Sequence, residues 1–277
     1  MRHREFTTPG RGEQQLFAQC WLPEREARAV VVIAHGLGEH SGRYAELAQR
    51  LVAQRHAVYA LDHRGHGRSP GRRANIERFS YLVTDLATFA GRAARQHPGS
   101  PSILLGHSMG GAIATAAALK IQGTLRGLVL SGPALASGEI VSGFKSRLVR
   151  ALSSLAPNAG ALKLPPEAVS RDPEVVRAYE QDPLVHHAAV PARTVAELLE
   201  AMAGFPEAVL KLRLPLLVQH GIADSLVPVE PCRPIFQSIP SSDKTLKFYE
   251  GLYHEVYNEP ERDQVISDLE GWIAARC

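Results

Sequence analysis

Gly106-His107-Ser108-Met109-Gly110-Gly111 is the stretch of this chain that says most about its fold. It follows a short apolar run at 103–105 and precedes an alanine-rich segment at 112–119 that is typical of a buried helix. Gly-x-Ser-x-Gly between a strand and a helix is the layout of a nucleophile elbow, in which a tight turn holds the serine hydroxyl clear of the sheet. Because a bare Gly-x-Ser-x-Gly also occurs by accident, its meaning depends on whether the chain supplies a base, an acid and an oxyanion site.

Length and composition fit one large α/β domain, or a domain with an insertion, in a chain of 277 residues. The net charge of +3 comes without a dense Lys/Arg cluster interleaved with aromatics, so nucleic acid is not an expected partner. The three cysteines are widely spaced and form no C-x-x-C pair, which favours a reducing compartment. The first residues lack a signal-peptide core and no run is long enough to span a membrane, so we expect a soluble cytoplasmic protein.

Apolar runs alternate with helical patterns, which indicates a mostly parallel sheet flanked by helices on both faces. The β-branched run 30–34 is typical of a strand buried on both faces. A hairpin is expected for 6–8 and 16–18, around Pro9-Gly10-Arg11-Gly12. Further strands are expected at 57–61, 103–105, 128–130, 214–219 and 246–248, and helices at 44–54, 82–93, 112–119 and 265–273.

The pattern changes between residues 134 and 213, where no convincing strand is found. Helical runs occupy 144–155 and 195–202, and Asp172-Pro173 is a good N-cap and first-turn pair for a helix that reaches Tyr179. We therefore predict a hydrolase-type core formed by 1–133 and 214–277, with 134–213 inserted as a helical cap, or lid.

A serine hydroxyl needs a base to take its proton and an acid to orient that base. Folds with a nucleophile elbow carry these groups in the order Ser, then Asp or Glu, then His. Asp224 lies in the turn after the expected strand 214–219, and His254 lies in the loop after the last expected strand. No other histidine follows Asp224, so the order predicts Ser108, Asp224 and His254 as the triad.

Metal binding is the alternative use of the histidines. A zinc helix that begins at His254-Glu255 would need histidine at position 258, where the chain has Asn258. His63 and His66 resemble ligands, but no further ligand has suitable spacing, and a glycine-rich turn that shapes the pocket floor is the better interpretation. Neither a metal nor a cofactor is expected.

Acyl transfer places negative charge on the former carbonyl oxygen, and backbone N–H groups must already point to it. The residue after the serine supplies one donor, here Met109 at the start of a helix. The loop after the early strand supplies the other, and Leu37 between Gly36 and Gly38 is the predicted donor.

Several longer motifs carry a family resemblance. They occupy 35–44 (HGLGEHSGRY), 62–69 (DHRGHGRS), 106–111 (GHSMGG), 179–184 (YEQDPL), 253–255 (YHE) and 258–260 (NEP). Over essentially its whole length the chain resembles the monoacylglycerol lipases, in particular their bacterial branch, which are serine hydrolases of the α/β-hydrolase superfamily. The resemblance implies an α/β-hydrolase fold, and hydrolysis of monoacylglycerols to glycerol and fatty acid, without cofactor, beneath a mobile apolar cap.

Carried over by position, the resemblance implies the same triad and the same oxyanion donors, Leu37 and Met109. It also implies that Glu39, Arg43 and Tyr179 line the glycerol pocket. Tyr257 stands where mammalian members have a second histidine, and we count it among the predicted substrate-binding residues.

Other functions remain open at this stage. A general short-chain esterase, a lysophospholipase or an acyltransferase would use the same triad, because specificity depends on the cap and the pocket. An intact triad argues against a noncatalytic binding protein, and the serine argues against dehalogenase or epoxide hydrolase chemistry. The apolar cap residues Phe144, Leu148, Leu152 and Leu155 could dock peripherally on lipid surfaces or pack on the core.

Overall fold

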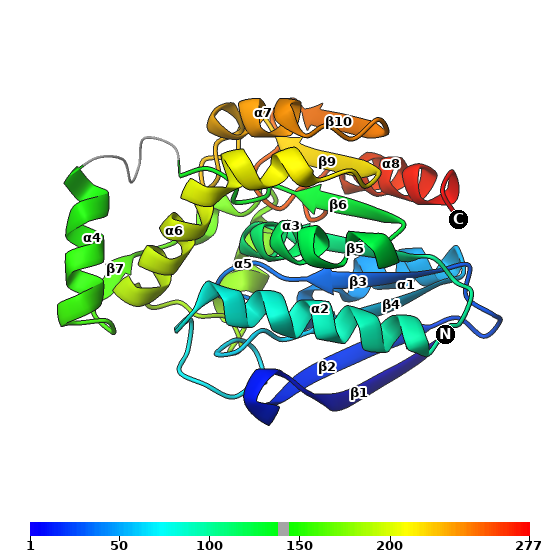
Figure 1. Ribbon diagram of the computed structural model, residues 1–277, viewed down its shortest axis with the longest axis horizontal. Coiled ribbons are helices and arrows are strands. Elements are labelled where there is room, and N and C mark those ends of the chain that lie inside the picture. Colours follow the sequence, from blue (N-terminus) through cyan, green and yellow to red (C-terminus); the bar gives the residue numbers. More distant parts are fainter. Residues whose placement is uncertain (138–143) are drawn as a thin grey trace.

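The computed structural model shows one eight-stranded sheet crossed by helices on both faces (Figure 1). The structure describes residues 1–137 and 144–277. For residues 144–146 it describes the backbone alone. The strand order is β1-β2-β4-β3-β5-β6-β9-β10. The first two strands, β1 (Arg2–Pro9) and β2 (Gln15–Leu22), are antiparallel, which confirms the predicted hairpin. The parallel strands are β3 (Ala29–Ala34), β4 (His56–Leu61), β5 (Ser102–His107), β6 (Gly127–Ser131), β9 (Leu216–Gly221) and β10 (Lys244–Tyr249).

Two hydrophobic layers hold the helices to the sheet. One contains side chains of α2 (Phe79–Arg95), α3 (Met109–Ile121) and α7 (Val229–Ser238), and the other contains those of α1 (Ala45–Ala53) and α8 (Arg262–Ala274). Successive residues of β3 enter opposite layers, Val30 and Val32 one, Val31 and Ile33 the other. The prediction of a strand buried on both faces at 30–34 is therefore confirmed.

The sequence pattern does not predict helix α7. Pro231 and Pro234 fall inside it, and proline normally argues against a helix interior. Its buried side chains nevertheless recur at helical spacing, at Val229, Cys232 and Phe236. This spacing is the signal that could have revealed the helix.

In the described residues between β6 and β9, three α-helices and a small ladder lie outside the main sheet. They are α4 (Phe144–Leu155), α5 (Pro173–Gln181), α6 (Ala192–Ala208) and the antiparallel pair β7 (Gly160–Leu162) with β8 (Val190–Pro191). In Figure 1, α4 and β7 stand to one side of the sheet. The expectation that 134–213 contains no strand is wrong, because strands of two and three residues are too short to produce an alternating pattern.

The elbow between β5 and α3 forms as predicted. Ser108 adopts φ 53° and ψ −120°, a backbone conformation that residues other than glycine rarely adopt. The chain packs so closely there that a Cβ at Gly110 would lie 2.1 Å from the Ala34 carbonyl oxygen, and one at Gly106 would lie 2.3 Å from the Gly110 carbonyl oxygen. Glycine at both positions lets β5, α3 and β3 approach backbone to backbone.

Gly110→Ala tests this close approach. The new Cβ forces backbone apart, so we expect the free energy of unfolding to fall by about 1–3 kcal/mol or more. Gly123→Ala is the matched control, because a Cβ there meets no atom within 4 Å. Urea unfolding followed by circular dichroism measures both variants, and equal stability of the two would contradict the packing argument.

Candidate active site

The three predicted triad residues lie at the carboxyl edge of the parallel strands. Ser108 follows β5, Asp224 lies in the turn after β9, and His254 lies in the loop after β10. Because parallel strands end at the same edge, residues far apart in sequence meet there. Ser108 and His254 line one cavity of about 110 Å³ together with Leu37 and Met109, and Asp224 lies behind His254.

Asp224 holds His254 in a defined orientation. Its Oδ2 accepts a hydrogen bond from His254 Nδ1 at 2.7 Å. Its Oδ1 accepts from the N–H groups of Leu226 and Val227, at 2.9 and 2.8 Å, which fixes the carboxylate. Since Nδ1 is the donor, Nε2 of His254 is the nitrogen left to exchange a proton with substrate and serine.

His220 is a further contact of the acid that the sequence pattern does not single out. Its Nε2 donates to the Val227 carbonyl at 2.8 Å and lies 3.3 Å from Asp224 Oδ2. The side chains of His220 and Asp224 are fully buried. Position alone, at the penultimate residue of β9 and four residues before the acid, is the signal that could have found it.

Burial and charge act in opposite directions on the pair. Burial raises the pKa of Asp224, but the charge of His254 and hydrogen bonds from His220 and His254 outweigh it, so that pKa lies well below its usual range. Burial lowers the pKa of His254, but the Asp224 carboxylate outweighs it, so the pKa of His254 is raised above 6.5. Asp224 is therefore ionised, and His254 is a stronger base than a free imidazole.

The serine and the base face the same cavity without being bonded to each other. In the described part of the chain, no hydrogen bond joins the Ser108 hydroxyl to His254. Bonds of this kind often tighten only when substrate is bound. The ring of His107 packs 4.6 Å from that of His254 and limits its movement.

The two predicted oxyanion donors lie at the same cavity. Among the described residues, neither the Leu37 N–H nor the Met109 N–H donates to another protein group. Met109 is the first residue of α3, where an N–H has no partner within the helix. A Cβ added at Gly36 would lie 3.3 Å from Ser108 Cβ, so the loop that carries Leu37 lies directly against the serine.

Two side chains of the loop itself, Glu39 and His35, hold its conformation. Glu39 Oε1 accepts from the Gly36 N–H at 2.5 Å and from the Tyr44 hydroxyl at 2.7 Å. His35 donates from Nδ1 to the Gly36 carbonyl, and its Nε2 accepts from the His63 N–H at 2.9 Å. The loop conformation is thus set before substrate arrives, as oxyanion stabilisation requires.

His63 and His66 pack with His35 beneath this loop. Their ring centroids lie 4.3 and 5.3 Å from that of His35. No group of three or more His, Cys, Asp or Glu side chains in residues 1–137 and 147–277 is arranged to hold a metal ion. Neither histidine lines the cavity; they support the loop that carries Leu37 from below.

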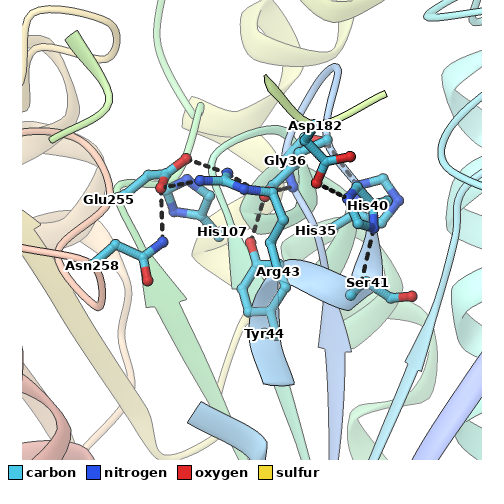
Figure 2. A network of polar contacts seen from close by, with 12 residues as sticks. His35, Gly36, His40, Ser41, Arg43, Tyr44, His107, Asp182, Glu255 and Asn258 are labelled. Carbon is cyan, nitrogen blue, oxygen red and sulfur yellow. Dashed lines mark hydrogen bonds and ion pairs between the residues drawn. The ribbon is translucent and has the colours of Figure 1, made fainter. Parts of the chain in front are cut away.

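Arg43 joins two carboxylates beside the cavity (Figure 2). Its guanidinium makes two bonds to Glu255, Nη1 to Oε1 at 2.5 Å and Nη2 to Oε2 at 2.8 Å, and Nη1 also donates to Glu39 at 2.9 Å. The guanidinium lies 4.8 Å from the centre of the Tyr179 ring. Burial would raise the pKa of Glu39, but Arg43 outweighs it and lowers that pKa to about 2. Glu255 was missed as a site residue, although its place beside His254 marks it.

The predicted glycerol-pocket residues do not all reach the cavity. Glu39 and Tyr179 line it with Ser108, whereas Arg43 lies behind Glu39 and Glu255. Tyr257 does not line this cavity but a smaller neighbouring pocket, together with Arg43 and Glu255, and its role in substrate binding stays a prediction. Its hydroxyl donates to Gln219 Oε1 at 2.7 Å within the core, so the side chain turns away from the serine.

A strained serine at a strand-to-helix turn, opposite a histidine held by a buried carboxylate on this sheet, defines a serine hydrolase with the α/β-hydrolase fold. The family model described as serine aminopeptidase, S33, matches residues 25–261. The chain is 44% identical to a monoacylglycerol lipase of Mycolicibacterium smegmatis (98% of this chain, 97% of that one) and 37% identical to a rat monoglyceride lipase (95% and 88%). It superimposes on the solved monoacylglycerol lipase of Paleococcus ferrophilus with a TM-score of 0.85 and 30% identity, over 95% of this chain and 99% of that one. The chain belongs to the monoacylglycerol lipase family of serine hydrolases.

The raised pKa of His254 predicts the pH dependence of activity. The base must be neutral to act, so kcat/KM should fall on acidification with a midpoint above pH 6.5. Asp224→Asn removes the charge that raises this pKa, so the midpoint should move lower and kcat should drop about 10⁴-fold. The measurement is the pH profile of p-nitrophenyl ester hydrolysis, with Asp263→Asn, an exposed carboxylate, as the control. A midpoint that stays in place in Asp224→Asn would contradict the assignment.

Proposed function

We propose that this enzyme hydrolyses monoacylglycerols to glycerol and a free fatty acid, with Ser108, Asp224 and His254 as its catalytic triad. The observation that carries the proposal is the bond from His254 to buried Asp224 in a site that also exposes the elbow serine to the same cavity. The names of the two sequence relatives and of the solved neighbour support the substrate class.

The chemistry proceeds in two half-reactions. Ser108 Oγ attacks the ester carbonyl carbon while His254 Nε2 takes the hydroxyl proton, and the Leu37 and Met109 N–H groups stabilise the oxyanion. The C–O bond to glycerol breaks, and His254 returns the proton to the leaving oxygen. Water then gives a proton to His254 and attacks the acyl-serine, which releases the fatty acid and restores the serine.

The lining of the cavity suits a substrate with one acyl chain and a polyol. Glu39, Glu255 and Tyr179 give one wall polar groups for glycerol hydroxyls. The remaining wall is apolar and suits the chain; it contains Ala134, Leu164, Val169, Leu198, Met202, Leu226 and Val227. Several of these come from residues 134–213, in agreement with a cap over the site.

We propose that this cap, residues 134–213, opens to admit substrate. The cavity of about 110 Å³ is smaller than the roughly 300–1,000 Å³ of typical ligand pockets. An acyl chain therefore cannot enter without movement of the walls, and the cap contributes the walls that are not part of the main sheet. Cap opening of this kind also gates product release.

Ser108→Ala tests the nucleophile. Ester turnover should fall by about 10⁴-fold or more, because the acyl-enzyme can no longer form, while the fold is retained. Ser154→Ala, which removes an exposed hydroxyl from α4, should leave turnover unchanged. Release of fatty acid is measured for monoacylglycerol, diacylglycerol, lysophosphatidylcholine and a short-chain ester. Undiminished turnover in Ser108→Ala contradicts the triad, and a preference for lysophosphatidylcholine or the short-chain ester contradicts the proposed substrate.

The cap also carries features of a lipid-docking surface, and we propose that the enzyme contacts lipid surfaces peripherally in the cytoplasm. Leu148 and Leu155 on α4 are 59% and 87% exposed, and Arg147 and Arg150 beside them are exposed as well. An apolar stripe flanked by basic residues is typical of a helix that lies in a membrane interface. Leu152 is half-buried, and the side chain of Phe144 lies outside the described residues. None of the described helices is both long enough and apolar enough to cross a bilayer.

Leu148→Ser/Leu155→Ser tests this surface. Removing two exposed leucines should weaken binding to anionic phospholipid vesicles by about tenfold or more and lower activity on aggregated substrate. Turnover of a soluble ester should be unchanged. Leu210→Ser is the matched control, since Leu210 is 50% exposed but lies outside α4, the helix that carries the proposed surface. Equal vesicle binding by the wild type and the double variant in a flotation assay would rule the surface out.

A further inference from the structure

A second, larger cavity of about 600 Å³ lies between the β1–β2 hairpin and the C-terminal half of α2. It is at the amino edge of the parallel strands, because Trp21 near the end of β2 pairs with Val58 near the start of β4. Ser108 lies at the opposite, carboxyl edge, and the two cavities share no lining residue. Figure 1 shows β1 and β2 along one border of the sheet beside α2. The volume of this second cavity, an open groove, lies within the range typical of ligand pockets, about 300–1,000 Å³.

The floor of this groove is apolar. Side chains alternate along β1, so Phe6 shares a face with Arg4 and Arg2, and their neighbours across the hairpin are Ala18, Cys20 and Leu22. The ring of Phe89 on α2 lies 6.5 Å from that of Phe6 and 6.3 Å from that of Tyr59. Together the apolar and aromatic lining residues are Phe6, Leu22, Tyr59, Phe89 and Ala93.

Positive charge lines the groove, and no carboxylate among the described residues forms an ion pair with it. Four arginines line it, Arg2 and Arg4 from β1 and Arg92 and Arg95 from α2. In the part of the chain that the structure describes, Arg2, Arg4 and Arg95 form no ion pair, and Arg92 donates only to the Thr8 hydroxyl and the Pro9 carbonyl.

The one acidic residue at this groove is committed elsewhere. Glu5 falls on the other face of β1 by strand alternation, and its carboxylate pairs with Arg68 at 2.7 Å. The four guanidinium groups therefore repel one another around an apolar floor, and a bound anion would relieve that repulsion.

We propose that this groove binds the anion of a long-chain fatty acid. Guanidinium groups match a carboxylate in bidentate geometry, so the head lies among the arginines. The apolar floor along Phe6, Leu22 and Phe89 takes the acyl chain, whose removal from water drives binding. An anion without a chain would leave the floor exposed, and a chain without charge would leave the arginines unneutralised. The hydrolysis proposed for Ser108 releases this class of compound, but binding here does not depend on that activity.

Titration of the full-length Ser108→Ala protein with laurate, below its critical micelle concentration, tests the site. His97 is the local reporter, because its ring lines the groove and hydrogen-bonds the Tyr59 hydroxyl at 2.9 Å. We expect saturable shifts of the His97 ring signals in NMR. Arg4→Gln/Arg95→Gln should weaken laurate binding at least tenfold, with each single variant intermediate. Arg25→Gln/Arg73→Gln, which removes the same charge from exposed arginines outside the groove, should bind as before.

Chain length and head group separate this site from a simple anion patch. From octanoate to laurate, affinity should rise about three- to fourfold for each added CH₂ group. Dodecanol binding as tightly as laurate, inorganic phosphate producing the same His97 shifts at the same concentration, or unchanged laurate affinity in Arg4→Gln/Arg95→Gln would each overturn the proposal. Because the protein carries Ser108→Ala, these outcomes are independent of whether the enzyme hydrolyses monoacylglycerols.

Discussion

The catalytic geometry depends on the buried contact of Arg43 with Glu39 and Glu255. Glu39 holds the Gly36 N–H, and therefore the loop that carries one oxyanion donor, while Glu255 is the residue next to the catalytic base. One guanidinium thus ties the loop after β3 to the loop after β10, two segments separated by more than half of the chain. Both loops must keep their relative positions during acyl transfer. The ion pairs of Arg43 fix these positions, as a covalent cross-link between the loops would.

Burying these charges is favourable only because each has a partner. A buried ion pair roughly balances its desolvation cost, but an unpaired buried charge costs several kcal/mol. The same logic governs Asp224, whose two oxygens are fully used by His254, His220 and two backbone N–H groups. The low dielectric that makes burial costly also strengthens the field that raises the basicity of His254. Stability and catalysis therefore use the same polar contacts at the carboxyl edge of the sheet.

The sheet can be predicted from the sequence because it follows from periodicity, whereas the triad is a prediction from the order of serine, aspartate and histidine along the chain. Ser108, Asp224 and His254 are predicted as a triad by their order after three strands, and the structure places all three at the carboxyl edge of the parallel strands. Sequence patterns do not reveal features that depend on contacts between distant parts of the chain. Tyr257 is near His254 in sequence, yet its hydroxyl bonds Gln219 in the core, and nothing in the local pattern sets that direction. Helix α7 was hidden by its prolines, and the short β7–β8 ladder exists only because two distant segments of the chain meet.

The core sheet and the segment 134–213 have different roles in the proposed function: the core holds the catalytic residues in place, and the segment moves. The proposed triad and oxyanion donors lie in the turns and loops that follow β3, β5, β9 and β10 and in the first turn of α3. At the elbow, backbone packs on backbone without room for a Cβ at Gly106 or Gly110. In the proposed function, residues 134–213 move as a cap, and its side chains at the cavity, such as Leu198 and Met202, belong to no strand of the main sheet. A rigid edge would keep the distances between Ser108, His254 and the Leu37 loop while the proposed cap opens, because the buried Arg43 joins Glu39 and Glu255, which both lie outside residues 134–213. Substrate choice can therefore change through the cap alone, with the chemistry at Ser108 left as it is.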